Sequence, residues 1–250
     1  MSRTRIRWEI VIVLGLSLGA SAVYAVVAII AAATAPVALA DQSTSVNPAR
    51  SQREWLDFTY QFLSHFFDLL PVALALYLLW LPARSAFDRI GLDLRRPGGD
   101  LVRGLGLFLA IGVPGIVFFA VCRLLGLNLA VEASSLDTYW WTVPMLVFSA
   151  LRAALVEEVI VVGYLFTRLK ELAWSPWLII GAAALLRGTY HLYQGYGPFI
   201  GNIVMGLVFG WCFLRWGRVM PLVVAHALLD IVSFVGYPLA VSLWPDVFAA

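Results

Sequence analysis

Seven apolar stretches, each long enough to cross a lipid bilayer, dominate this 250-residue sequence. A transmembrane helix needs about 17–25 mostly apolar residues, and such stretches lie at about 9–35, 62–82, 101–122, 141–166, 177–193, 198–214 and 219–242. Only 13% of the residues are charged, whereas a soluble domain carries about 25%. So few charges cannot cover a soluble globule of this size with a solvated surface. The sequence therefore predicts an all-α, polytopic transmembrane bundle of about seven helices, or eight.

The positions of the basic residues predict how this bundle is oriented. With the N-terminus in the cytoplasm, 12 of the 17 basic residues fall in cytoplasmic segments and three in external ones, while Arg152 and Arg187 fall inside helices. This bias follows the positive-inside rule. We therefore expect a multi-pass protein of the cell (inner or cytoplasmic) membrane whose partner is the lipid bilayer. No run of basic residues is typical of a nucleic-acid surface, so we expect no nucleic-acid partner.

The first apolar stretch has a second interpretation, a secretory signal peptide. Basic residues and an apolar run precede an Ala-x-Ala sequence at 38–40. The apolar run covers about 10–40, however, and a signal peptide has an apolar core of about 7–15 residues. We therefore favour an uncleaved helix. The chain then divides into N-terminal transmembrane helices with a cytoplasmic linker (1–135), a helical core (141–235) and a C-terminal tail (236–250).

Ionisable residues gather inside the apolar stretches of the C-terminal half. Such a residue in a transmembrane helix costs about 2.5–3.5 kcal/mol on insertion scales, so it indicates a functional site. The residues concerned are Glu157, Glu158, His191, His226 and Asp230.

Helical spacing relates these residues to one another. His226 and Asp230 lie four residues apart on one helix face. Glu157 and Glu158 point about 100° apart, so we expect one of them to face a cavity and the other to take a partner such as Arg152 or Arg187. Depths counted along the helices place the carboxylates and imidazoles in one cavity near the middle of the membrane.

A carboxylate, two imidazoles and an Asp in such a cavity suit hydrolysis without a covalent intermediate. A shielded carboxylate can activate a water with help from one His, and the other His and the Asp can stabilise an oxyanion. The sequence contains neither an obvious Ser or Cys nucleophile motif nor the zinc motif HExxH.

The order Glu-Glu, His about 30 residues later, and His-x-x-x-Asp about 35 residues further resembles the CPBP intramembrane proteases, which include the type II CAAX prenyl endopeptidases and bacteriocin-processing or immunity proteins. The resemblance spans about 141–235 and implies an intramembrane endopeptidase. It implies that Glu157 and His191 activate the water, that His226 and Asp230 form the oxyanion site, and that Glu158 is supportive. It also implies a membrane-embedded or lipidated peptide substrate that reaches the cavity from the cytoplasmic side.

Two departures from the family pattern occur. The Arg of the first motif, Glu-Glu-x-x-x-Arg, is Val162 here, and the aromatic residue four positions before the first His is Arg187. We therefore hypothesise that Arg187 pairs with Glu158 or Glu157 and replaces the missing ion pair. Carboxylate-activated water requires no metal, so we expect no cofactor and keep zinc as the alternative.

Two other functions stay open. One is a catalytically inactive membrane scaffold or bacteriocin-immunity protein that keeps the fold, which the change at Val162 permits. The other is a proton-coupled transporter that uses the glutamates and histidines as a relay.

Overall fold

The computed structural model describes residues 2–236, 238 and 239, and helices make up nearly all of its regular structure. The N-terminal part contains α1 (Arg3–Gly15), α2 (Leu18–Ala33), η1 (Leu39–Asp41), β1 (Ser43–Ser45), α3 (Glu54–Asp68), α4 (Leu70–Leu79), α5 (Ala86–Ile90), α6 (Pro97–Leu124) and β2 (Ala130–Glu132). The C-terminal part contains α7 (Thr142–Glu157), η2 (Glu158–Tyr164), α8 (Leu165–Glu171), α9 (Pro176–Thr189), η3 (Leu192–Gln194), α10 (Tyr196–Trp216), α11 (Met220–Ile231) and η4 (Val232–Gly236). The prediction of an all-α bundle is confirmed. The predicted tail, 236–250, lies almost wholly outside the described residues.

As far as the structure describes them, the seven predicted apolar stretches are mainly helical, but the described residues contain fewer long uninterrupted spans. Three helical segments are long and apolar enough to cross a membrane, namely Glu54–Leu79, Pro97–Leu124 and Tyr196–Trp216. The pair α1 and α2 makes a fourth if its 55° bend is counted as one broken span. The remaining stretches differ for physical reasons: α7 and η2 carry three charged residues, while α9 and the α11–η4 segment are shorter.

Apolar side chains cover the outside of the bundle as a lipid-facing helix requires. On α6, Leu109, Val113 and Ile116 each expose more than half of their surface, at 57%, 61% and 69%. These side chains would be unfavourable in water and are favourable against lipid chains.

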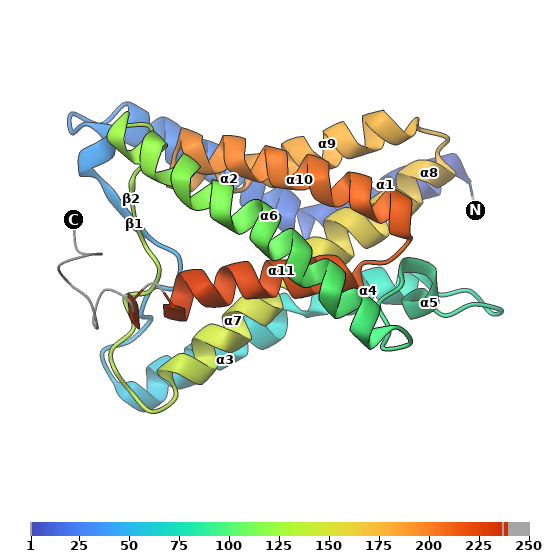
Figure 1. Cartoon of the computed structure of the whole chain (residues 1–250), viewed down its shortest axis with the longest axis horizontal. Coiled ribbons are helices and arrows are strands. Elements are labelled where there is room, and N and C mark those ends of the chain that lie inside the picture. Colours follow the sequence, from blue (N-terminus) through green and yellow to red (C-terminus); the bar gives the residue numbers. More distant parts are fainter. Residues whose placement is uncertain (1, 237, 240–250) are drawn as a thin grey trace.

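Local signals in the sequence set the helix ends. Ser175 caps α9 by accepting a hydrogen bond from the amide of Leu178, and Pro176 takes the first helical position. Gly217 ends α10 in the left-handed region, with φ at 66°. These two signals mark the same end of the antiparallel pair α9 and α10, which lie side by side in Figure 1.

Close backbone approach holds α9 and α10 together. A Cβ added at Gly188 would lie 2.8 Å from the carbonyl oxygen of Phe199, and one added at Gly206 would lie 2.8 Å from Cα of Ala184. Neither position has room for a side chain, so these glycines allow the two helices to pack tightly. This packing brings the residues of α9 that carry the site against α10.

At the end of the bundle that holds α5, the first helix α1 packs against α8 (Figure 1). There Arg168 of α8 donates from Nε to Oε1 of Glu9 in α1 at 2.6 Å, and Tyr164 donates to the same oxygen at 3.1 Å. At the opposite end, a short parallel pair joins β1 to β2, with Ser43 opposite Ala130. The ion pair thus ties α1 to the C-terminal part at one end, and the strand pairing joins two segments of the N-terminal part at the other.

Candidate functional site

Arg187 lies at the centre of the charged cluster, with only 1% of its surface exposed. Its Nη1 donates to Oε1 of Glu158 at 2.8 Å, and its Nη2 lies 3.3 Å from Oε2 of Glu157. Its guanidinium also stacks over the ring of Phe209, 5.2 Å from the ring centre. The contact that the sequence hypothesis expects between Arg187 and the two glutamates is therefore present in the structure.

The two adjacent glutamates lie where the α-helix α7 passes into the segment η2. Glu158 begins the π-helical segment η2, whose i→i+5 hydrogen bonds make a wider turn than the α-helix does. Glu157 and Glu158 both keep α-helical backbone angles, with φ and ψ at −74° and −49° and at −75° and −33°, and different nitrogens of the guanidinium reach the two carboxylates. Glu158 is fully buried with Arg187 as its partner, and Glu157 keeps 11% of its side chain exposed. This arrangement fits the expectation that one glutamate faces a cavity while the other takes a partner.

Tyr190 holds the carboxylate of Glu157 from the other side. Its hydroxyl donates to Oε2 of Glu157 at 2.8 Å, the same oxygen that faces Arg187. Among the described residues Oε1 of Glu157 has no hydrogen-bond partner, and the side chain keeps 11% of its surface exposed. One oxygen of Glu157 is therefore fixed and the other is free to bind a small molecule such as water.

His226 brings α11 to the same cluster. Its Nδ1 lies 2.7 Å from Oε1 of Glu158, and its Nε2 lies 3.5 Å from Oδ2 of Asp230. A carboxylate accepts hydrogen bonds and cannot donate them, so Nδ1 carries a proton and donates it to Glu158. This bond fixes the ring orientation and directs Nε2 toward Asp230.

His191 follows the last turn of α9 and is half-buried. Its Nδ1 donates to the carbonyl oxygen of Arg187 at 2.9 Å, since a carbonyl only accepts. In the neutral ring Nε2 is then an acceptor. No hydrogen bond or ion pair joins His191 to Glu157 among the described residues, so we expect an intervening water where they cooperate.

Arg152, predicted as a supporting partner of the glutamates, does not reach them in the described structure. Its Nη1 lies 3.6 Å from Asp68, and its Nη2 donates to Ser149 at 3.4 Å. Five residues separate Arg152 from Glu157, which is about 140° around a helix. The interpretation of Arg152 as a partner of the glutamates was therefore wrong.

Tyr190 and Phe209 are site residues that sequence reasoning missed. The cluster of tyrosines near His191 is typical of a membrane-interface belt, which obscured the separate role of Tyr190. The spacing could have identified Tyr190, because it lies three residues after Arg187 and therefore on the same helix face.

The cluster includes a set of side chains that could hold a metal. One ligand atom from each of Glu157, Glu158 and His226 lies within 4.8 Å of the others. However, the guanidinium of Arg187 already contacts all three side chains, the His226 ring included, with Nη2 at 3.1 Å from Nδ1. The residues as arranged therefore do not fit a metal ion, and no chemical step is derived through one.

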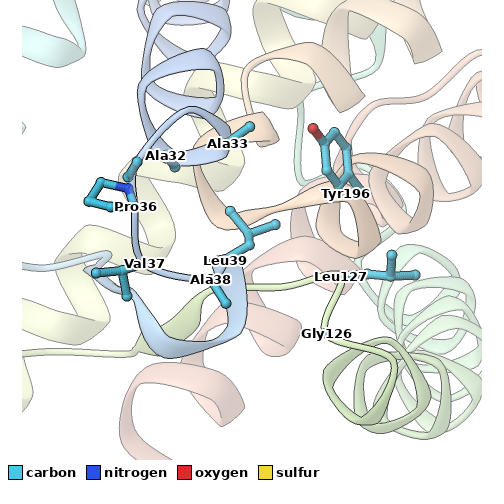
Figure 2. Close-up of a pocket in the computed structure, with 10 residues that line it drawn as sticks. Ala32, Ala33, Pro36, Val37, Ala38, Leu39, Gly126, Leu127 and Tyr196 are labelled. Atoms are coloured by element: carbon cyan, nitrogen blue, oxygen red, sulfur yellow. The ribbon is translucent and has the colours of Figure 1, made fainter.

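Among the cavities that the described residues form, two lie beside α2. The larger, of about 470 Å³, lies between residues 32–39, Gly126–Leu127 and Tyr196 (Figure 2), and no candidate catalytic residue lines it. A second, of about 300 Å³, is bounded by α2 residues and by Tyr190 and Tyr193. Because Tyr190 also contacts Glu157, this smaller cavity adjoins the cluster.

Comparison with known proteins agrees with the sequence motifs. Residues 139–232 match the family model described as type II CAAX prenyl endopeptidase Rce1-like. The matched segment contains every residue of the charged cluster, and the match confirms the resemblance read from the sequence. No curated protein and no solved structure matches the chain.

Proposed function

We propose that this protein is an intramembrane protease of the CPBP type, which the family match over residues 139–232 supports. In this proposal it hydrolyses a peptide bond of a membrane-associated, lipidated substrate with a water activated by Glu157. The observation that carries the proposal is the asymmetric environment of the Glu157 carboxylate. One oxygen is held by Tyr190 and Arg187, and the other is unoccupied by protein donors.

In this mechanism the water binds between Oε1 of Glu157 and Nε2 of His191. Glu157 accepts one proton of the water as the oxygen attacks the peptide carbonyl, and His191 orients the water through its acceptor nitrogen. The proton is then passed to the leaving amine. Atoms balance without a covalent enzyme intermediate, since water supplies both the hydroxyl of the new acid and the proton of the amine.

The oxyanion formed in this step is stabilised by His226 and Asp230. In the doubly protonated ring, Nδ1–H is bonded to Glu158 and Nε2–H is left for the oxyanion. Asp230 faces Nε2 at 3.5 Å, and it donates to the oxyanion itself only as the neutral acid. Glu158 acts indirectly, by holding the His226 ring and the Arg187 guanidinium.

Substrate access is proposed from the side of α2. The smaller cavity is lined by Ser21, Tyr24, Ala25 and Ala28 together with Tyr190 and Tyr193. Its mainly apolar wall suits the lipidated part of a peptide, and Tyr190 connects it to the catalytic carboxylate.

The test is cleavage of a prenylated CAAX-type peptide by the full chain reconstituted in liposomes, with products identified by mass spectrometry. We expect cleavage by the wild-type protein, none by Glu157→Gln, and normal cleavage by Glu132→Gln, which changes an exposed glutamate of β2. An unprenylated peptide of the same sequence shows whether the lipid is required. Equal cleavage by wild type and Glu157→Gln would refute the proposal.

A catalytically inactive scaffold is the second candidate. The observation in its favour is that Glu157, the general base of the first proposal, lies 3.3 Å from a guanidinium, while the family's motif Arg is replaced by the buried Val162. A scaffold would retain its cellular effect in both Glu157→Ala and His226→Ala, and would cleave no peptide.

A further inference from the structure

Three side chains that commonly bind metals converge in the membrane-embedded core. Glu157 and Glu158 come from the junction of α7 and η2, and His226 comes from α11. All three are buried, with 8%, 0% and 5% of their surfaces exposed. Carboxylate oxygens and imidazole nitrogens are ligands that Zn²⁺ accepts, at about 2.0–2.2 Å from the metal.

The guanidinium of Arg187 occupies the centre of this ligand set. Its Nη1 lies 2.8 Å from Oε1 of Glu158, and its Nη2 lies 3.3 Å from Oε2 of Glu157 and 3.1 Å from Nδ1 of His226. An arginine in a protein stays charged, because its pKa exceeds about 12. A divalent metal placed among the same atoms would therefore meet a fixed positive charge at contact distance.

The surroundings of Arg187 match a guanidinium in shape as well as in charge. The planar group lies over Phe209, 5.2 Å from the ring centre. Its stem passes over Gly206, where an added Cβ would come within 3.3 Å of Cδ of Arg187. The pocket around Arg187 is thus formed by α9, α10, η2 and α11 together.

We propose that the guanidinium of Arg187 is a tethered cation standing where a divalent metal would bind, so that removing it opens a zinc site formed by Glu157, Glu158 and His226. The guanidinium organises the three side chains in the wild-type protein. In Arg187→Ala the vacated volume lets the ligand atoms, now within 4.8 Å of one another, contract to the separation of at most about 4.4 Å that a common Zn²⁺ allows. This proposal does not depend on the proteolytic function.

The experiment measures zinc bound to the full chain in detergent micelles, purified without a histidine tag. Wild type, Arg187→Ala, Arg187→Lys and the double variant Arg187→Ala/Glu158→Gln are dialysed against Zn²⁺ and analysed for metal content. We expect about one Zn²⁺ per chain in Arg187→Ala, and a raised melting temperature when zinc is added. Wild type and Arg187→Lys should bind none at this site, and the double variant should lose the gained zinc.

Two results would overturn the proposal. One is stoichiometric zinc in the wild-type protein that disappears in Glu158→Gln. The other is a folded Arg187→Ala protein that binds no zinc. If Arg187→Ala fails to fold, the wild-type protein still decides the question, because a chelator must leave its melting temperature unchanged if the guanidinium is the resident cation, and must lower it if a metal is.

Discussion

Removal of the Arg187 charge is the perturbation whose effect on stability the structure defines most fully. In Arg187→Met the stem volume is largely kept and the guanidinium is lost. Glu158 is fully buried, and its Oε2 has no hydrogen-bond partner in the described structure. Its Oε1 would then keep only the bond from His226.

Breaking a buried ion pair by removing one partner costs about 3–5 kcal/mol, because the other charge is left uncompensated. We expect a loss of that size in Arg187→Met. The double variant Arg187→Met/Glu158→Gln removes the stranded charge as well, so it should be more stable than the sum of the two single changes predicts. The free energy of unfolding of the double variant should differ from the sum of the two single changes by about 2–3 kcal/mol, near the upper end of the range for contacting residues.

The assay is equilibrium unfolding of the four proteins in the same detergent, followed by tryptophan fluorescence. Arg152→Met is the matched control, since Arg152 lies 3.6 Å from the half-exposed Asp68 and away from the glutamates. It should cost well under 1.5 kcal/mol, as exposed ion pairs contribute about 0–1 kcal/mol. Additivity of the Arg187 and Glu158 changes within about 0.5 kcal/mol would refute the reasoning.

Three further changes test other parts of the account. Tyr190→Phe should lower kcat about tenfold with little change in KM, because one hydrogen bond to the catalytic carboxylate is lost, whereas Tyr193→Phe should leave kcat near wild type; equal effects would contradict a specific role. Glu9→Gln should destabilise the protein by about 1.5–3 kcal/mol, because the hydrogen bond from Arg168 loses its charged acceptor while Arg168 keeps its ion pair with Glu171; thermal unfolding measures the loss, and a neutral effect would mean that α1 contributes little to the bundle. The hydrogen bond from Arg218 lowers the pKa of Asp93 from 3.8, so the ionised carboxylate stabilises the protein above pH 3.8 and this stability is lost as the pH falls below that value. In Asp93→Asn the free energy of unfolding should therefore decrease less between neutral and acid pH than in wild type. The same decrease in both proteins would contradict this role of Asp93.

The sequence predicted the helices well, because a bilayer demands long apolar segments and few charges. It also predicted which polar residues gather, since Glu157, His191, His226 and Asp230 interrupt apolar stretches where a charge is costly. Helical spacing alone linked His226 to Asp230, and the structure places Nε2 of one 3.5 Å from the other.

Other features depend on contacts between distant segments and could not be derived from local spacing. Both glutamates contact the guanidinium of Arg187 at once, whereas the sequence hypothesis specified a pair with Glu158 or Glu157. Tyr190 donates to Glu157, 33 residues away, although its tyrosine-rich neighbourhood favoured an interface belt. Arg152 was assigned to the glutamates by charge alone, and its helix face directs it to Asp68 instead.

The most direct test of the central claim is the single-turnover rate of peptide cleavage by wild type and by Glu157→Gln in the same liposomes. The substitution keeps the size of the side chain and removes the base. If Glu157 activates the water, the rate should fall by about 10²–10⁴-fold while binding of the lipidated peptide is retained. A Glu157→Gln protein that cleaves at the wild-type rate would contradict the account.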